Sequence, residues 1–326
     1  MIRLRRATEQ DAELAFRITE RTMRGYAEQT WGRFDEAAAR ENAKKMIAAG
    51  TYAIIHDAAE DIGVLHVERD RGDLWLAHLF ILPEHQRKGI GTRFLRELKQ
   101  EATGARKPLR LRVLTVNPAL RLYQREGFTI FTTTLGRTYM QWRPDGLDVP
   151  TSAGLCPAEV RSILDGCGIT ADQVAERYLV VQPEARELEL VAREPTGREH
   201  HLAPKAASAW RGMRSAAEAQ GVQLALVSAF RSVSRQGEII RGKLARGLHL
   251  EQILKVNAPP GYSEHHTGLA LDIGTDGAPA LDAAFEHSPA FAWLSANAAS
   301  FGFRLSYPRG NPYGFEYEPW HWCFKP

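Results

Sequence analysis

The sequence has few cysteines, little net charge and no long apolar run. Cys156, Cys167 and Cys323 cannot all pair with one another, and without an export signal they are most simply reduced thiols. A formal net charge of +3 over 326 residues is too small to indicate nucleic-acid binding. No segment approaches the ~18 apolar residues of a membrane span, and the first residues lack the apolar core of a signal peptide. These absences favour a cytoplasmic protein with neither a nucleic-acid nor a membrane partner.

The length and composition are those of a globular protein with room for two domains. Hydrophobic residues make up 44% of the chain and charged residues 25%. Residues 143–152 contain proline and glycine without periodic apolar positions, which is typical of a linker. We therefore expect one domain over residues 1–148 and a second over residues 149–326.

Two segments near the C-terminus carry the side chains of a hydrolytic metal site. Residues 263–272 read SEHHTGLALD and offer an imidazole and a carboxylate, and residues 318–322, EPWHW, add another imidazole. Two histidines and one aspartate are a typical open zinc set, with a fourth position for water. Zinc lowers the pKa of bound water to roughly 7. Glu318 lies three residues before His321 and can take the proton and pass it to a leaving amine. Such a group of side chains hydrolyses amides.

These segments resemble the signature S-x-H-x-x-G-x-A-x-D followed by E-x-W-H, which belongs to the D-alanyl-D-alanine carboxypeptidase and dipeptidase metallopeptidases. Upstream, residues 228–236 read SAFRSVSRQ and are similar to the S-G-Y-R-S-x-x-x-Q segment of that family. Ala229 and Phe230 depart from its usual glycine and tyrosine. The resemblance implies an α+β zinc D,D-peptidase fold and a small peptide substrate ending in D-amino acids, and it leaves carboxypeptidase and dipeptidase action open.

The same resemblance implies a role for individual residues. The implied zinc ligands are His265, Asp272 and His321. Glu318 is implied as the general base, and Arg231 as the residue that polarises the scissile carbonyl and stabilises the tetrahedral intermediate. The implied substrate contacts are Gln236 and Ser263.

Other histidines and a cysteine lie near these segments. In a strand, adjacent side chains point to opposite faces, so we expect His265 rather than its neighbour His266 at the metal. His200 and His201 are expected in a polar loop without an acidic partner at the motif spacing, and therefore outside any metal site. Cys323 is expected to be a small buried residue rather than a ligand.

The N-terminal half alternates helix and strand patterns. The predicted helices are 8–23, 35–49 and 91–102, and the predicted strands are 52–56, 62–69 and 74–82. Residues 86–92, QRKGIGT, lie between the last strand and the last helix. Backbone amides at a helix N-terminus bind phosphate, and glycines let the backbone approach it closely. The loop is therefore a candidate anion site.

This loop, with its Q-x-x-G-x-G pattern, resembles motif A of the GNAT acyl-CoA-dependent acetyltransferases. Residues 116–128, VNPALRLYQREGF, are similar to the N-x-x-A-x-x-x-Y-x-x-x-G-F element of that family, with a small shift in spacing. The resemblance implies a mixed central sheet with flanking helices, and pyrophosphate binding by the loop. The implied acetyl-CoA contacts are Gln86, Arg87, Lys88, Gly89, Ile90, Gly91, Thr92 and Asn117. Tyr123 is implied to protonate the departing thiolate.

The sequence indicates the site that binds the acetyl acceptor only weakly. Residues 26–34 are expected between the first two helices, where Tyr26, Trp31 and Phe34 can pack against a substrate and Glu28 can attract an amine. A loop packed on its own aromatic residues is an equally good interpretation. Candidate bases on strands are Glu68 and His78.

The elements predicted for the second domain are helices 157–164, 202–219, 234–247 and 289–299, a strand 224–228, and a hairpin that pairs 178–181 with 188–192.

The combined prediction is a fusion of two α+β domains with two activities. One activity is zinc-dependent hydrolysis of a D-Ala-D-Ala-type peptide, and the other is acetyl-CoA-dependent N-acetylation of an amine. One alternative is a peptidase whose GNAT half only binds acyl-CoA or a partner; the loop glycines and Tyr123 argue against it. The other is a non-enzymatic, zinc-stabilised binding module, which would leave Glu318 idle.

Overall fold

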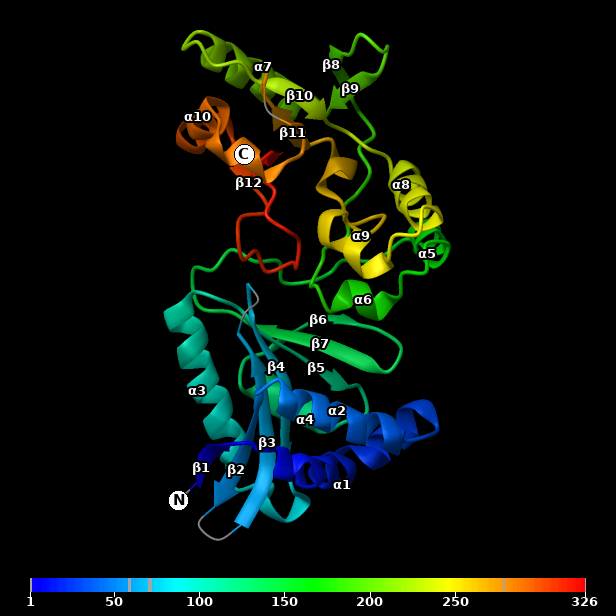
Figure 1. Ribbon diagram of the computed structural model, residues 1–326, viewed down its shortest axis with the longest axis vertical. Helices are drawn as coiled ribbons and strands as arrows, with labels where there is room; N and C mark the ends of the chain where they lie inside the picture. Colours follow the sequence, from blue (N-terminus) through cyan, green and yellow to red (C-terminus); the bar gives the residue numbers. More distant parts are fainter. Residues whose placement is uncertain (1, 58–59, 70–71, 278, 326) are drawn as a thin grey trace. The chain divides into compact units, whose positions relative to one another are not determined.

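The computed structural model describes residues 2–57, 60–69, 72–277 and 279–325. It divides the chain into two compact units, Met1–Ala153 and Gly154–Pro326, a few residues beyond the expected boundary (Figure 1). No helix among the described residues is long and apolar enough to cross a membrane.

A seven-stranded mixed sheet forms the centre of the N-terminal unit, in the order β1-β2-β3-β4-β5-β7-β6. Its strands are β1 (Ile2–Arg6), β2 (Tyr52–Asp57), β3 (Glu60–Glu68), β4 (Leu74–Ile81), β5 (Leu109–Leu114), β6 (Thr129–Thr133) and β7 (Arg137–Trp142). Its helices are η1 (Glu9–Asp11), α1 (Ala12–Trp31), α2 (Glu36–Ala48), η2 (Pro83–His85), α3 (Ile90–Ala105) and α4 (Ala119–Arg125).

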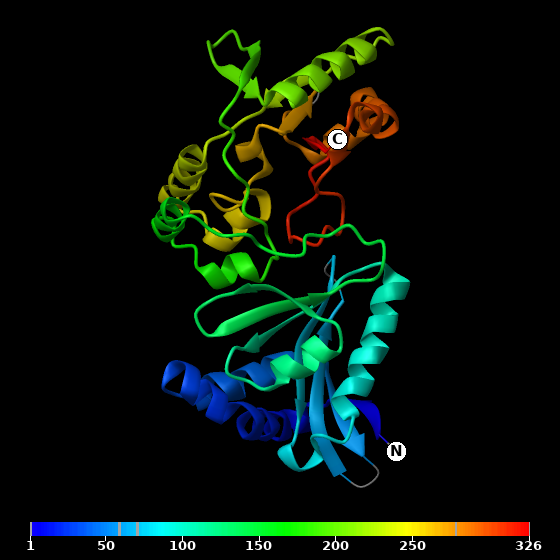
Figure 2. The ribbon, with the colours of Figure 1, turned by 180° about the vertical axis from the view of Figure 1, so that it is seen from behind.

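Helices cover both faces of this sheet (Figures 1 and 2). Adjacent strand residues point to opposite faces, and β2 shows the consequence. Ile54 packs in the core that contains Phe16 of α1, whereas Ile55 packs in the core that contains Phe94 of α3. Helices α1 and α2 therefore lie on one face, and α3 and α4 on the other.

Strands β4 and β5 are parallel and separate after a short paired stretch. Their register runs from Leu74↔Leu109 to Leu76↔Leu111. Beyond that point β4 continues to Ile81 and β5 to Leu114. The divergence opens the sheet beside the C-terminal ends of both strands.

Helix α1 is longer than predicted and ends at Trp31, with Gly32 as its left-handed C-cap (φ 75°). No glycine or proline between Gly25 and Gly32 interrupts the helix, and Gly32 tolerates the positive φ of the C-cap that ends it. The prediction that Tyr26 and Glu28 lie in a loop is therefore wrong, because both are helical.

The C-terminal unit is built on an antiparallel four-stranded sheet in the order β10-β11-β13-β12. The strands of this sheet are β10 (Ala225–Ser228), β11 (Ala270–Gly274), β12 (Phe303–Leu305) and β13 (His321–Phe324). Two further strands of the unit, β8 (Glu189–Arg193) and β9 (Glu199–Leu202), form a separate two-stranded sheet. The helices of the unit are α5 (Ala158–Asp165), α6 (Ala171–Ala175), α7 (Pro204–Glu218), α8 (Val233–Ala245), α9 (Leu250–Val256), η3 (Glu264–Thr267), η4 (Ala283–His287), α10 (Pro289–Asn297) and η5 (Ala298–Phe301). Trp210 of α7 and Leu294 of α10 pack with Leu271 and Ile273 of β11 in the main core.

The predicted hairpin between 178–181 and 188–192 is wrong. Strand β8 instead pairs with β9, through a turn in which Gly197 adopts a φ of 87°. Tyr178 has a φ of 52°, which an extended strand does not allow, and its ring is buried. His200 and His201 consequently lie on strand β9 and not in a loop.

Candidate active sites

The C-terminal unit brings the three predicted metal ligands together. His265 lies in η3, Asp272 on β11 and His321 at the start of β13. Asp272 and His321 are directly opposite each other in the β11–β13 register. One ligand atom from each residue lies within 4.8 Å of the other two, and all three side chains are buried.

Hydrogen bonds orient both imidazoles towards this point. His265 donates from Nδ1 to the carbonyl oxygen of Ala229 at 2.7 Å, which leaves Nε2 facing Asp272 Oδ2 at 3.2 Å. His321 Nε2 lies 3.1 Å from Glu264 Oε2, and its Nδ1 lies 3.0 Å from Asp272 Oδ1. Partners of this kind fix the tautomer and ring orientation of metal-binding histidines.

The charges around these imidazoles favour a cation. Burial lowers the pKa of His321, but its hydrogen bonds to Asp272 and Glu264 outweigh burial and raise the pKa to about 10. Burial raises the pKa of Asp272, and the two imidazoles lower it further than burial raises it. The donor set of two imidazole nitrogens and one carboxylate is that of an open zinc site, so these residues fit zinc.

Glu318 and Arg231 share a cavity of about 590 Å³ with the three residues. Glu318 Oε2 lies 4.0 Å from His321 Nδ1, and burial raises the pKa of its carboxyl to about 7. Arg231 Nη1 donates to Gln236 Oε1 at 2.9 Å and Nη2 to Ser228 Oγ at 3.1 Å. A proton acceptor and a fixed cation therefore face the same space.

Gln236, predicted to contact substrate, has its amide engaged within the protein. Its Oε1 accepts from Arg231, and its Nε2 donates to the carbonyl of Ala258 at 2.7 Å. The side chain is 1% exposed, so its amide orients the guanidinium. Ser263 is buried, lines the cavity and directly precedes η3.

Sequence reasoning missed Glu264. Its carboxylate accepts hydrogen bonds from His321 and the Ser306 hydroxyl and forms an ion pair with Lys325 Nζ at 3.2 Å. Burial raises the pKa of Glu264, but His321 and Lys325 lower it, to about 2. The available signal was the position of Glu264 directly before His265 in the motif. In the expected strand, adjacent side chains point to opposite faces, so Glu264 would have pointed away from the site.

His266 lies outside the ligand group, as expected. The expectation rested on a strand in which His265 and His266 point to opposite faces, and that strand is wrong. His265 and His266 belong to a 3-10 helix, not to a strand. His266 Nδ1 donates to the Arg231 carbonyl at 2.6 Å, and its Nε2 accepts from the Gly261 amide at 3.1 Å. Both nitrogens are therefore used in holding the backbone.

His200 and Cys323 also lie apart from the ligand group. His200 Nε2 lies 2.7 Å from Glu194 Oε1, and Cys323 is 4% exposed.

In the N-terminal unit, the predicted anion loop leads into α3. Gln86 Nε2 donates to the carbonyl of Ile81 at 2.8 Å and ties the loop to the end of β4. Arg87 (φ 61°) and Gly89 (φ 79°) turn the chain into the helix, whose first amides lack helical acceptors. Lys88, Ile90 and Thr92 complete this turn and the first residues of the helix.

The two loop glycines serve different purposes. A Cβ at Gly89 would meet nothing within 4 Å, whereas a Cβ at Gly91 would lie 3.3 Å from Leu122 Cδ2. Gly91 therefore lets α3 approach α4. That either glycine clears room for pyrophosphate stays a prediction.

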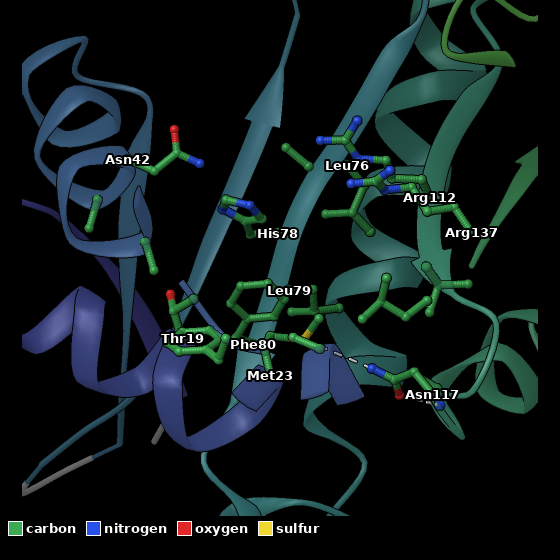
Figure 3. A pocket seen from close by; sticks show the side chains of 18 of the residues that line it. Thr19, Met23, Asn42, Leu76, His78, Leu79, Phe80, Arg112, Asn117 and Arg137 are labelled. Carbon is green, nitrogen blue, oxygen red and sulfur yellow. Dashed lines mark hydrogen bonds between the residues drawn. The ribbon is translucent and has the colours of Figure 1, made fainter. Parts of the chain in front are cut away.

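A second cavity, of about 500 Å³, lies where β4 and β5 diverge (Figure 3). Tyr123 and Asn117 line it, and burial raises the pKa of Tyr123 to about 12, so its hydroxyl keeps its proton near neutrality. Asn117 Oδ1 accepts from the Ala119 amide at 2.9 Å, and its Nδ2 lies 3.9 Å from Met23 Sδ.

The predicted acceptor residues divide into two groups. Trp31, Phe34 and His78 line the second cavity. Tyr26, Glu28 and Glu68 are not among its described lining residues, and Glu28 instead pairs with Arg24 at 3.5 Å. Sequence reasoning missed Arg33, Arg112 and Arg137, which also line this cavity.

Two family models match the chain, one in each unit. Residues 199–326 match the model described as VanY, D-alanyl-D-alanine carboxypeptidase, and residues 48–130 match an acetyltransferase (GNAT) domain. The chain thus combines a GNAT acetyltransferase domain with a VanY-type D-alanyl-D-alanine carboxypeptidase domain, and both resemblances are confirmed. The predicted fold class, two α+β domains, is also confirmed.

Two curated relatives of the chain are named as carboxypeptidases. The chain is 38% identical over 125 residues to YodJ of Bacillus subtilis (strain 168), which is named as a carboxypeptidase; the match covers 37% of this chain and 45% of that protein. It is 38% identical over 76 residues to a D-alanyl-D-alanine carboxypeptidase of Enterococcus faecium, covering 23% of each. The chain thus spans less than half the length of these relatives.

Two solved structures, a carboxypeptidase and an acetyltransferase, each resemble part of the chain. The LD-carboxypeptidase LdcB shares 29% identity, with a TM-score of 0.40, over 48% of this chain and 82% of that one. The PaiA N-acetyltransferase from Thermoplasma acidophilum, in complex with coenzyme A, shares 18% identity, with a TM-score of 0.37, over 44% of this chain and 99% of that one.

Proposed function

We propose that the chain is a bifunctional enzyme. Its second domain, residues 149–326, would hydrolyse a peptide ending in D-amino acids with the help of zinc. Its first domain, residues 1–148, would transfer acetyl from acetyl-CoA to an amine. The observation that carries the peptidase proposal is the convergence of three buried metal-type ligands, Glu318 and Arg231 on one cavity within the VanY match.

His265, Asp272 and His321 would hold the zinc ion. When bound, zinc supplies a Lewis acid that polarises a carbonyl and lowers the pKa of a water ligand. Glu264 keeps the His321 ring oriented, and the Ala229 carbonyl does the same for His265.

Glu318 would accept the proton of the attacking water and give it to the leaving amine. Its raised pKa near 7 suits both transfers, because a general acid–base works best when its pKa is close to the working pH. Arg231 would stabilise the oxygen on which negative charge develops. Gln236 and Ser228 hold its guanidinium before substrate binds, and such preorganised donors stabilise the transition state.

A D-Ala-D-Ala-type peptide is the proposed substrate, because the matching family model is described by that activity. In the first domain, the loop from Gln86 to Thr92 would bind the pyrophosphate of acetyl-CoA through the N-terminus of α3. Tyr123 would protonate the departing sulfur, since it is neutral and lines the cavity where the strands diverge. Because it uses acetyl-CoA, we propose that the enzyme acts in the cytoplasm.

The test is a metal and activity assay on the full chain. Protein purified without added metal should contain about one zinc per chain and release D-alanine from a peptide ending in D-Ala-D-Ala. His265→Ala should lose both zinc and activity, whereas His287→Ala, an exposed histidine, should keep both. A zinc-free wild-type protein with full peptidase activity would refute the metal assignment.

A further inference from the structure

The peptidase cavity contains a lysine that the proposed chemistry leaves unused. Lys243 of α8 lines this cavity of about 590 Å³ together with Arg231 and the metal-type ligands. Among the residues that the structure describes, its ammonium group has neither a hydrogen-bond nor an ion-pair partner. By contrast, Lys325 of the same domain pairs with Glu264 at 3.2 Å. Lys243 therefore offers the cavity a positive charge that no described side chain compensates.

The charged groups that act on the Lys243 ammonium are both positive. Burial lowers the pKa of Lys243, and the neighbouring Arg246 and Arg231 lower it further. Two exposed carboxylates, Asp282 and Glu316, also line the cavity, but neither forms an ion pair with Lys243, and Asp282 is the N-cap of η4. An anion bound beside Lys243 would offset the repulsion among these cations, so the position favours a carboxylate.

Helix α8 forms a wall that leads from the metal-type ligands towards solvent. Gln236, Ile239 and Lys243 line the cavity at spacings of three and four residues, so they share one face of the helix. Gln236, which holds Arg231, is 1% exposed, whereas Ile239 and Lys243 are partly exposed. Val256, at the end of the neighbouring α9, also lines the cavity and is 41% exposed (Figure 1). The helix advances about 10 Å from Gln236 to Lys243, which therefore lies at the mouth of the cavity.

A peptide that is cleaved next to its C-terminus fits this cavity in one direction. The proposed chemistry places the scissile carbonyl beside the metal-type ligands and Arg231. One amino acid follows that bond and extends about 4 Å beyond it, whereas the rest of the chain precedes the bond and must lead out to solvent. The mouth of the cavity therefore faces the residues before the D-Ala-D-Ala end. Since an extended peptide covers about 3.3 to 3.6 Å per residue, a long side chain directly before that end comes within reach of Lys243.

We propose that Lys243 binds the side-chain carboxylate of an acidic residue that directly precedes the D-Ala-D-Ala end of the substrate. This inference rests on the proposed peptidase function, and it narrows the substrate to an acidic peptide. Lys243 is then a specificity-determining residue, because its ammonium lies away from the reacting atoms. Such an ion pair strengthens the ground state and the transition state alike, so its loss raises KM rather than lowering kcat.

The experiment compares acetyl-Glu-D-Ala-D-Ala and acetyl-Gln-D-Ala-D-Ala as substrates of the full chain with zinc. The two peptides have nearly the same shape and differ in one charge, and the acetyl group removes the N-terminal charge from both. The kcat/KM for release of D-alanine should be about 3- to 10-fold higher for the glutamate peptide, the contribution of an ion pair that water partly screens. Added salt should reduce this preference.

Substitutions of Lys243 identify the source of the preference. Lys243→Met keeps the apolar stem and removes the charge, so the preference should disappear through a higher KM for the glutamate peptide. Lys243→Glu should make the glutamine peptide the better substrate, because like charges repel. Lys205→Met, which removes an exposed lysine of α7 outside the cavity, is the matched control and should keep the wild-type preference.

Calorimetry provides a readout that does not depend on turnover. Glu318→Gln is expected to keep its zinc and to cleave slowly, so the Kd of each peptide can be measured with this variant. The Kd should be about 3- to 10-fold lower for the glutamate peptide. Addition of Lys243→Met to this variant should make the two Kd values equal.

Equal use of the two peptides by the wild type would overturn the inference and leave the peptidase intact. If Lys243→Met weakens both peptides alike, Lys243 binds the terminal carboxylate that they share, and the inference is overturned as well. Failure of the zinc-loaded wild type to cleave either peptide would instead overturn the proposed peptidase function itself.

Discussion

Glu264→Gln tests whether the carboxylate behind His321 supports the metal site. In the structure, Glu264 Oε2 lies 3.1 Å from His321 Nε2, and Oε1 lies 3.2 Å from Lys325 Nζ. Glutamine has nearly the same shape and can still accept the imidazole proton. The substitution therefore removes the negative charge and the acceptor for Lys325, a half-exposed side chain that can turn to water, and it keeps an acceptor for His321.

Loss of that charge makes the His321 ring a weaker electron donor to a metal. Removing such an outer partner typically lowers metal affinity 10- to 100-fold, or about 1.4 to 2.7 kcal/mol. Zinc affinity is measured by competition with a chromophoric chelator at pH 7. The matched control is Glu189→Gln, which removes a half-exposed carboxylate paired with Arg211 at 3.0 Å in the same domain. Its zinc affinity should equal that of the wild type.

The reasoning would be refuted by a Glu264→Gln protein that binds zinc within about threefold of the wild type. Thermal unfolding of the zinc-free protein shows whether the variant is folded, because an unfolded variant would also bind zinc weakly. A folded variant with weakened zinc supports the assignment, whereas a variant that binds zinc normally shows that His321 is held by Asp272 and packing alone.

Other perturbations examine the remaining groups. Glu318→Gln should keep its zinc while peptide turnover falls roughly 10²- to 10⁴-fold, the range for general acid–base catalysis; zinc loss in this variant, measured by elemental analysis, would mean that Glu318 is a ligand. Gly89→Asp should weaken acetyl-CoA binding in calorimetry by about tenfold or more, because a negative side chain would enter open space beside the α3 N-terminus; unchanged binding would place the pyrophosphate elsewhere. Tyr123→Phe should lower the rate of acetyl transfer and leave peptidase kinetics unchanged, and a parallel fall of both would show that the two sites are coupled. The folded His78 binds a proton only near pH 3, whereas the unfolded side chain does so near pH 6.5, so its contribution to the stability of the N-terminal unit is present above pH 6.5 and is lost as the pH falls. At pH 5 the loss is at most about 2 kcal/mol, and His78→Gln should reduce the drop in melting temperature between pH 7 and pH 5; an unchanged drop would contradict this.

The sequence by itself was sufficient for the elements whose signals are local. Apolar periodicity predicted α7 and α10 close to their observed bounds, and strand-forming runs predicted β2 to β4. The motifs around His265 and His321 also predicted a ligand set that the fold brings within 4.8 Å. These predictions succeeded because residue type and short spacing determine helix formation, strand formation and the available donor atoms.

Only the tertiary structure decided what these groups meet. Glu264 reaches His321 because η3 turns it towards β13, 57 residues further along the chain. Arg112 and Arg137 become neighbours through the β5–β7 register, and a shift of that register by one residue would place them on opposite faces. Strand pairing, chain reversal and burial depend on contacts between residues distant in sequence, and no local pattern of residue types records which of those contacts form.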